Sequence, residues 1–426
     1  MENVNNQTIK KEFYHPIMDI YPSLKNQREC KSFSDLEYLK MGIGRTIMAV
    51  SSGRDWVQQY QMNENSKVSV GDFFDALKSP RRMAMIEEAA QKICLKVNES
   101  TKSNHDPFYC FPEMKKFAVY ATDGHSNKAS AHDPLIKDKK RACAHIYSLN
   151  LRTHSMTHLT HCQPNEGKKK KHEIMALKEL DSSILRMNER TGIKVIHAYD
   201  PAIVDYAAWR KWKNTKGIYI ITIEKANSAL EAMSVDLADR EDPVNIGVIS
   251  DQLVGSPSSG EALRRIEYED PATGNVYKFI TNEMTLRAGI IAYCYKMRWD
   301  IEKTFDETET KLLEDKEWGK SAVAKRQHGC FVSMGHNLML LLERTIEETD
   351  GIIDQKSLDK QIKRKIDDIQ KALQNNREPN YLIRTFHRVT QRSLQFIRWL
   401  RVVLINQEPR TVSIGKLKPY MEAFIE

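Results

Sequence analysis

The sequence contains few cysteines and no long apolar run, and each shortage excludes a class of protein. Its seven cysteines are scattered over 426 residues, and no two of them form a Cys-x-x-Cys pair. A disulfide framework is therefore not expected, and reduced thiols in a reducing compartment fit better. No apolar run approaches the roughly 18 residues of a membrane-spanning helix, and the first residues lack the apolar core of a secretory signal. These absences predict a cytoplasmic protein without a membrane partner.

What is present is an ordinary globular mixture with an excess of basic charge. Hydrophobic residues make up 41% of the chain and charged residues 29%, which is enough apolar material for a large core. A length of 426 residues is typical of two or three domains. The 65 lysines and arginines outnumber the 57 acidic residues and give a net charge of +8. That excess favours a polyanionic partner such as DNA, although many basic proteins bind no nucleic acid.

Residues 1–105 have the hydrophobic spacing of short helices. Apolar residues recur at helical intervals between Ser34 and Val50, and Ser69 and Pro80 are typical first residues of two further helices. Basic residues at a junction between helices permit a DNA-end-binding module of the helix-turn-helix type; they are Lys78, Arg81 and Arg82. A helical cap with a solvated basic edge is the alternative.

Residues 106–225 switch to strand patterns separated by helical ones. Apolar runs of strand length lie at 116–122, 141–151, 155–161, 192–199 and 217–223. Helical patterns follow the third and the fourth of these runs, near 173–191 and 202–214. Strands that alternate with helices predict an α/β sheet with helices on its faces.

Residues 226–285 interrupt this pattern. The runs 263–269 and 276–281 flank the turn sequence Asp-Pro-Ala-Thr-Gly-Asn, which is typical of a β-hairpin. Residues 286–345 return to helices that would complete the core, and residues 346–426 also have a helical pattern. The sequence therefore predicts a β-rich insertion in an α/β core, with helical regions at both ends of the chain.

Two aspartates occupy positions where catalytic groups often gather. Asp123 and Asp200 each follow an apolar run of strand length. In open α/β sheets, ligands and catalytic groups collect at the ends of the strands. Two neighbouring carboxylates need a cation between them, and hard oxygen ligands favour Mg²⁺. The alternative is that each aspartate is simply a turn residue.

A third carboxylate belongs to a pattern near residue 300. Tyr295, Arg298 and Glu302 are spaced i, i+3 and i+7, so they would share one face of a continuous helix. This composition is unusual for a core but suits a helix that presents a metal ligand beside a nucleic-acid backbone. A solvated amphipathic helix with an Arg–Glu pair is the alternative.

These residues, in this order, resemble the DDE transposases of bacterial insertion sequences, in particular the large "insertion sequence four" group. That group carries a motif of tyrosine, arginine, glutamate and lysine, and Tyr295, Arg298 and Glu302 match its first three members. AVYATDGH at 118–125 resembles its first-aspartate strand, and VIHAYDPAIVDY at 195–206 its second. The resemblance covers roughly residues 70–345 and is most specific between 276 and 305.

The resemblance implies a ribonuclease-H-like catalytic core interrupted by the β-rich insertion. Asp123, Asp200 and Glu302 would be the catalytic residues and would hold two Mg²⁺ ions, for which Mn²⁺ can substitute. The implied DNA-end contacts are Tyr295, Arg298 and Trp299. The implied activity is cutting of DNA at the ends of an insertion sequence and joining of the 3′-hydroxyl to target DNA. The implied partners are terminal-repeat and target DNA and a second copy of the chain, and in a bacterium the protein would associate with the nucleoid.

One position departs from the family motif. The lysine of the motif would stand at 309, where this chain has Glu309. Lys311 is nearby, but on a continuous helix it would point away from Glu302. A catalytically impaired or domesticated DNA-binding protein therefore stays open as an alternative. A metal-dependent nuclease that cuts without joining is another.

Two other features are read as structural. Cysteines and histidines are dense between Cys143 and Cys162, but their spacing matches no standard zinc finger, and Cys143, His145 and Tyr147 alternate as strand positions do. Basic residues at Lys168 to Lys171, and the ladder Arg384, Arg388 and Arg392, are interpreted as solvated surface rather than DNA contacts.

Overall fold

The structure is a computed structural model of the whole chain. It describes residues 3–30, 33–50, 52–101, 106–136, 138–162, 173–256, 259–350, 355–380, 394–405 and 411–413. Its helices are α1 (Asn6–Ile20), α2 (Asp35–Ile47), α3 (Gly53–Glu64), α4 (Val70–Ala76), α5 (Pro80–Glu99), α6 (Glu173–Glu179), α7 (Tyr206–Lys216), α8 (Ala288–Met297), α9 (Trp299–Asp306), α10 (Ala322–Asp350), α11 (Gln355–Gln374) and α12 (Leu394–Ile405). Its strands are β1 (Asn3–Asn5), β2 (Phe117–Asn127), β3 (Cys143–Asn150), β4 (Met156–Cys162), β5 (Lys194–Tyr199), β6 (Ile218–Ile223), β7 (Glu231–Ala232), β8 (Val248–Gly255), β9 (Leu263–Glu269), β10 (Val276–Thr281) and β11 (Thr411–Ser413).

A nine-stranded mixed sheet runs through the molecule in the order β4-β3-β2-β5-β6-β10-β9-β8-β7. β2, β3 and β4 form an antiparallel meander. β5 pairs in parallel with β2, and β6 in parallel with β5. The predicted α/β class is thus confirmed at the level of a mixed sheet with helices on both faces.

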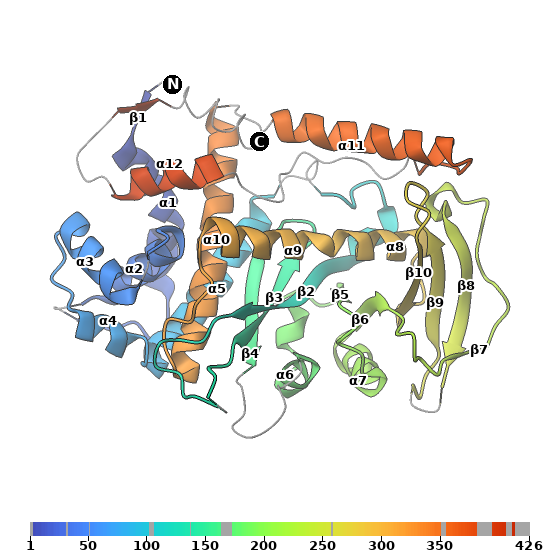
Figure 1. Cartoon of the computed structure of the whole chain (residues 1–426), viewed down its shortest axis with the longest axis horizontal. Helices are drawn as coiled ribbons and strands as arrows, with labels where there is room; N and C mark the ends of the chain where they lie inside the picture. The colour runs from blue at the N-terminus through green and yellow to red at the C-terminus, as the bar shows by residue number, and fades with distance from the viewer. Residues whose placement is uncertain are drawn as a thin grey trace.

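Helices cover the two faces of the sheet in different ways (Figure 1). α8 and α9 lie along one face, and α6 and α7 lie on the other. Because side chains alternate along a strand, the buried residues of β2 divide between two apolar cores. Val119 and Ala121 belong to the core beneath α8 and α9, whereas Ala118 and Tyr120 belong to the core that includes α6 and α7.

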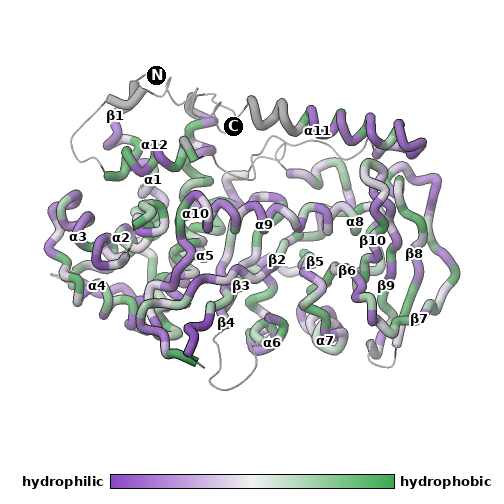
Figure 2. The backbone as a smooth tube through the Cα atoms, viewed as in Figure 1, coloured by the Kyte–Doolittle hydropathy of each residue, from purple (hydrophilic) through white to green (hydrophobic). Residues whose placement is uncertain are grey.

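A separate helical lobe packs against the β4 end of the sheet. It combines α1 to α5 with α10 and α12 around one apolar core. Serine starts four of its helices, since the side chains of Ser34, Ser52, Ser69 and Ser79 each accept a backbone N–H three residues later, the usual device at a helix N-terminus. In Figure 2, hydrophobic residues are frequent along α10, where the lobe meets the sheet, while the outer helices α3 and α11 carry long hydrophilic stretches.

The predicted insertion continues the sheet instead of forming a separate body. The hairpin expected at 263–269 and 276–281 is present as β9 and β10. β10 pairs antiparallel with β6, and β8 and β7 extend the sheet beyond β9. The backbone N–H of Glu224 donates to the carbonyl oxygen of Lys278 at 2.7 Å. The chain therefore leaves the core sheet at the end of β6 and rejoins it through β10, directly beside that end.

Two expectations about the whole chain can be compared with the structure. All seven cysteines are free thiols, as their scattered spacing predicted. Within the described ranges, none of the helices has both the length and the apolar composition needed to cross a membrane.

Candidate active site

The two aspartates singled out by the sequence lie next to each other at the centre of the sheet. β2 and β5 pair in parallel, with Thr122 opposite Tyr199, and Asp123 and Asp200 are the next residues of the two segments. The apolar residues at the alternating positions before them pack beneath α8 and α9. Since alternate residues of a strand share a face, the Asp123 carboxylate belongs to the α9 side of the sheet, and Asp200 stands just beyond the end of β5, where its Oδ1 accepts the Ala202 N–H at 2.9 Å.

The strand that carries Asp123 is longer than its apolar pattern predicts. The pattern ends at Thr122, but β2 continues to Asn127. Residues 123–127 pair antiparallel with residues 143–147 of β3, whereas the parallel pairing with β5 stops at Thr122. The polar residues remain in the strand because β3 supplies their backbone hydrogen bonds. Asp123 therefore lies where the parallel pairing ends, inside a strand that goes on.

A guanidinium joins Asp123 to Glu302. Glu302 lies in α9, and Arg298 stands one turn before it, at the junction of α8 and α9. Nη1 of Arg298 donates to Asp123 Oδ2 at 2.7 Å and to Glu302 Oε1 at 3.1 Å. Bonds of 2.7 and 3.1 Å allow these two oxygens to be no more than 5.8 Å apart. Carboxylates from distant parts of the chain thus meet at one point.

This point carries more negative charge than its one guanidinium balances. Burial raises the pKa of Asp123 to about 7, and the charges of Glu302 and Glu173 also act in that direction. The Gly124 N–H and the Arg298 guanidinium oppose the rise. Carboxylates this close together favour a cation between them. The electrostatics of the site therefore suit a positively charged ligand.

The donor set fits a hard divalent cation. Asp123, Asp200 and Glu302 offer carboxylate oxygens, which Mg²⁺ prefers at about 2.0–2.1 Å. Two oxygens bound to one such ion lie about 4 Å apart or less, so a small movement from the present arrangement would suffice. Arg298 Nη1 occupies the position between the Asp123 and Glu302 carboxylates that a shared cation would take. The same oxygens accept Mn²⁺.

The aromatic neighbours of Arg298 have different environments. The ring of Tyr295 is centred 5.6 Å from the guanidinium carbon of Arg298. Burial raises the pKa of Tyr295, and the charges of Asp200 and Asp123 add to the rise against the effect of Arg298. Tyr295 is therefore within electrostatic reach of both aspartates. Trp299 is 58% exposed, so its indole ring is available to a ligand that approaches from solvent.

The helix that carries these residues is not uniform. The N–H of Arg298 donates to the carbonyl of Tyr295 at 3.0 Å, and the N–H of Ile301 to that of Arg298 at 3.1 Å. Both bonds span three residues, so a tight 3₁₀-like step joins α8 to α9. The three motif residues remain on one side despite this step. The sequence pattern did not reveal it.

A π-helical turn, η6 (Glu307–Lys311), follows α9. The wider π-helical turn changes the number of residues per turn, so Glu309 does not come above Glu302 as it would on a continuous α-helix. Glu309 is exposed, and its charge adds to the effect of Asp315 in raising the pKa of Lys128. A continuous regular helix that would bring Glu309 beside Glu302 is therefore not formed.

A fourth carboxylate, Glu173, was missed by the sequence reasoning. It is the first residue of α6, on the opposite face of the sheet from α9. Its Oε1 lies only 2.2 Å from where a Cβ on Gly124 would be, so the glycine makes room for the carboxylate beside Asp123. The position of Glu173 at the start of the helix after the third core strand could have drawn attention to it. Nothing in the sequence indicated that it would lie against Gly124.

The two basic stretches noted in the sequence, Lys168 to Lys171 and the arginines at 384, 388 and 392, lie outside the described residues.

Comparison with known proteins gives no family assignment. No protein-family model matches the chain, and no curated protein sequence matches it significantly. A functional argument therefore rests on the motif residues and on the geometry described above.

Proposed function

We propose that this protein is a cytoplasmic DDE transposase that cuts DNA at the ends of a mobile element and joins the 3′-hydroxyl to target DNA. The observation that carries the proposal is the meeting of Asp123 and Glu302 on Arg298, with Asp200 at the end of the neighbouring parallel strand. Burial raises the pKa of Asp123, and groups with such shifted pKa values cluster at functional sites.

The order of the core strands supports a ribonuclease-H-like core. The sequence β4-β3-β2-β5-β6, with an antiparallel meander followed by two parallel strands, is the order expected of that fold. In such a core, one catalytic carboxylate lies on the first strand, one follows the fourth strand, and one lies on a late helix. The positions of Asp123 on β2, Asp200 after β5 and Glu302 on α9 are consistent with this arrangement.

The residues divide into ligands and positioning groups. Asp123, Asp200 and Glu302 would hold two Mg²⁺ or Mn²⁺ ions, which when bound supply activation of the attacking oxygen and stabilisation of the leaving oxygen. Arg298 is placed to contact a DNA phosphate once its carboxylate partners bind a cation, because a guanidinium binds carboxylate and phosphate alike. Trp299 offers an exposed ring on which an unpaired base can stack.

The proposed substrate is double-stranded DNA held by a homodimer of the chain. The net charge of +8 suits contacts with the DNA backbone, whereas Arg81 and Arg82 at the start of α5 are both paired with Asp35. Binding to an element end should weaken steeply as salt rises, since each phosphate contact releases counterions.

The test uses the full chain and a supercoiled plasmid that carries the DNA found on both sides of the gene. We expect nicked and linear products with Mg²⁺, and joined products when a second plasmid is present. Asp123→Asn, Asp200→Ala and Glu302→Gln should each abolish both reactions. Lys296→Gln, on the exposed side of α8, is the matched control and should leave them unchanged. Full Mg²⁺-dependent cleavage by Asp200→Ala would refute the proposal.

The same assay separates the two alternatives. Glu309 in place of a motif lysine favours a catalytically impaired DNA-binding protein, which would bind element ends in a gel-shift experiment but release no cut strand. A nuclease without strand transfer would cut the plasmid, and no joined product would form.

A further inference from the structure

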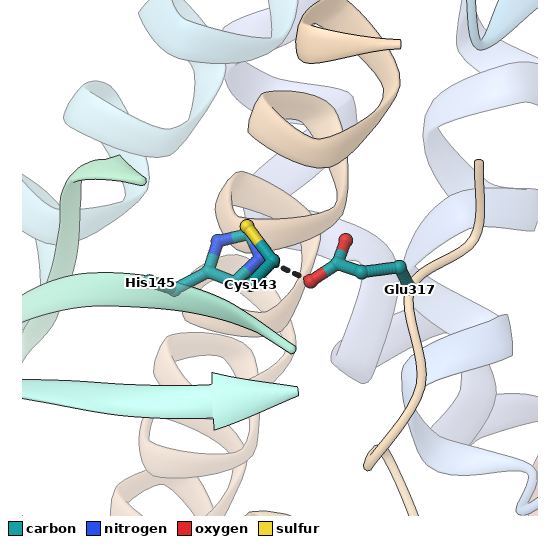
Figure 3. A group of neighbouring side chains, drawn as sticks. All are labelled: Cys143, His145 and Glu317. Atoms are coloured by element: carbon teal, nitrogen blue, oxygen red, sulfur yellow. Dashed lines mark hydrogen bonds and ion pairs between the residues drawn. The ribbon is translucent and has the colours of Figure 1, made fainter. Parts of the chain in front are cut away.

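A second group of potential metal ligands lies apart from the carboxylates of the proposed active site. Cys143 and His145 are two residues apart on β3 and so share a face of the sheet. Glu317 comes from the segment between η6 and α10. A sulfur, a nitrogen and an oxygen atom from these three residues all lie within 4.8 Å of one another. Figure 3 shows the imidazole and the carboxylate directed at each other, with the sulfur beside the ring.

We propose that Cys143, His145 and Glu317 form a structural Zn²⁺ site. Thiolate, imidazole and carboxylate are the three kinds of side chain that bind zinc in proteins. The side chains of His145 and Glu317 are 0% exposed, and Cys143 is equally buried. A site closed to solvent has no open position for a substrate, so its role is structural and not catalytic.

The atoms of these ligands that would face away from the ion already have partners. His145 Nδ1 lies 3.0 Å from His158 Nε2, and Glu317 Oε2 lies 3.3 Å from His328 Nδ1. Zinc-bound histidines and carboxylates usually have such outer hydrogen bonds, which orient the ligand and fix the imidazole tautomer. Nε2 of His145 now donates to Glu317 Oε1; with Nδ1–H donating to His158 instead, Nε2 would give its lone pair to an ion in place of that proton.

The movement needed to admit the ion is small. His145 Nε2 and Glu317 Oε1 are now 2.5 Å apart, whereas tetrahedral zinc with bonds of about 2.0–2.1 Å needs about 3.3 Å. The backbone N–H of Glu317 donates to the Lys128 carbonyl at 2.9 Å, so this increase must come from a small rotation of the Glu317 side chain. The Cys143 thiol, which now donates to the Cys162 carbonyl at 3.4 Å, would release its proton on binding. His161 is paired with His145 across the strands, with ring centroids 5.8 Å apart, and is a candidate for the fourth ligand.

The site would tie two parts of the fold together. β3 supplies two ligands, and the third belongs to the segment that follows the helix with Glu302. Zinc would therefore fasten that segment to the sheet. The sequence spacing could not indicate this, because Glu317 is far from the Cys–His cluster in the chain.

The experiment measures zinc and cobalt binding by the purified full chain. After washing with a weak chelator, we expect about one zinc per chain by mass spectrometry of the metal. Replacement by Co²⁺ should give the near-ultraviolet charge-transfer band of a thiolate–cobalt bond. Cys143→Ser should lose this band, while Cys294→Ser, a buried cysteine in a different core, should keep it.

The band also separates this site from the carboxylate site, which contains no sulfur. A wild-type chain without bound zinc and without a cobalt band would overturn the proposal even if every variant failed to fold. A band that survives in Cys143→Ser, or that disappears in Cys294→Ser, would overturn it as well. Glu317→Gln should retain the band but lower zinc affinity at least tenfold, and unchanged affinity would exclude Glu317 as a ligand.

Discussion

Replacement of Arg298 by methionine tests whether one cation holds the active-site carboxylates together. Arg298 is only 9% exposed, and its partner Asp123 is 13% exposed. Removing one member of a buried ion pair typically costs about 3–5 kcal/mol. The contact with Glu302, whose side chain is 38% exposed, adds little because solvent screens it. We expect Arg298→Met to lose about 3 kcal/mol of stability in the absence of divalent metal.

The size of this loss should depend on pH in a defined direction. The pKa of Asp123 is raised by burial to about 7, compared with about 3.9 in an unfolded chain. Stability therefore falls as the pH rises between these values and is constant above them. Without the guanidinium, the folded pKa is higher still, so the fall continues to higher pH. The difference between wild type and variant should widen above pH 7.

Divalent metal should reduce the difference in stability between wild type and Arg298→Met. If Arg298 occupies the place of a cation, Mg²⁺ competes with it in the wild type but not in the variant. Ligand at about 100 times its dissociation constant stabilises a protein by about 2.7 kcal/mol, enough to offset most of the loss. Thermal unfolding at several pH values, with and without Mg²⁺, measures this directly. Lys296→Met, which removes an exposed pair with Asp270, is the control.

Two results would refute the reasoning. One is an Arg298→Met variant as stable as wild type without metal. The other is an equal Mg²⁺-induced rise in melting temperature for both proteins, because the guanidinium and the metal would then not share ligands.

Three further predictions follow from other positions in the structure. Gly124→Ala places a methyl group against Glu173, and it should slow Mg²⁺-dependent cleavage about 10–100-fold with little loss of melting temperature. Glu173→Gln should have the same effect. Normal cleavage rates in both variants would exclude the Glu173 carboxylate from the site. Asp35 is fully buried and paired with two arginines of α5; burial alone would raise its pKa, but the hydrogen bonds hold the pKa below its ordinary value. Asp35→Asn should therefore lower the free energy of unfolding, measured with urea at neutral pH, by about 3 kcal/mol. This difference from wild type should shrink as the pH falls through the pKa of Asp35 in the folded protein. Asp75→Asn, at an exposed position, is the control and should change the free energy of unfolding very little. Glu309→Lys should change the affinity for an element end and its salt dependence very little in a binding titration, because the π-helical turn takes this exposed residue out of line with Glu302; a higher affinity with a steeper salt slope would show that the position does contact DNA.

The strands were predictable because burial leaves a simple mark on the sequence. β5, β6, β9 and β10 lie where apolar runs or a hairpin turn predicted them. The closeness of Asp123 and Asp200 could be expected from the sequence, because ligands and catalytic groups tend to collect at the ends of parallel strands. In the structure it results from the parallel pairing of β2 with β5. The presence of Glu302 beside them could be predicted only through the family motif.

Other parts of the site left no local mark. The extension of β2 beyond Thr122 depends on its partner β3, and the π-helical turn after α9 depends on packing further along the chain. Glu173 reaches the site because Gly124, on another element, has no side chain. Glu317 reaches His145 across a long stretch of sequence. Each of these features depends on residues that are distant in the sequence. The local sequence around them contains no pattern that predicts them.

The return of the chain to its starting point at Glu224 and Lys278 has a consequence for how such a protein can change over time. A segment whose two ends are hydrogen-bonded to each other can grow, shrink or be exchanged without altering the spacing of the residues that hold it. β6 and the last residues of β10 would remain paired, and α8 would still begin from the same place. Mutation and selection can therefore reshape β7, β8 and β9 for new recognition tasks while Asp123, Asp200 and Glu302 stay where they are.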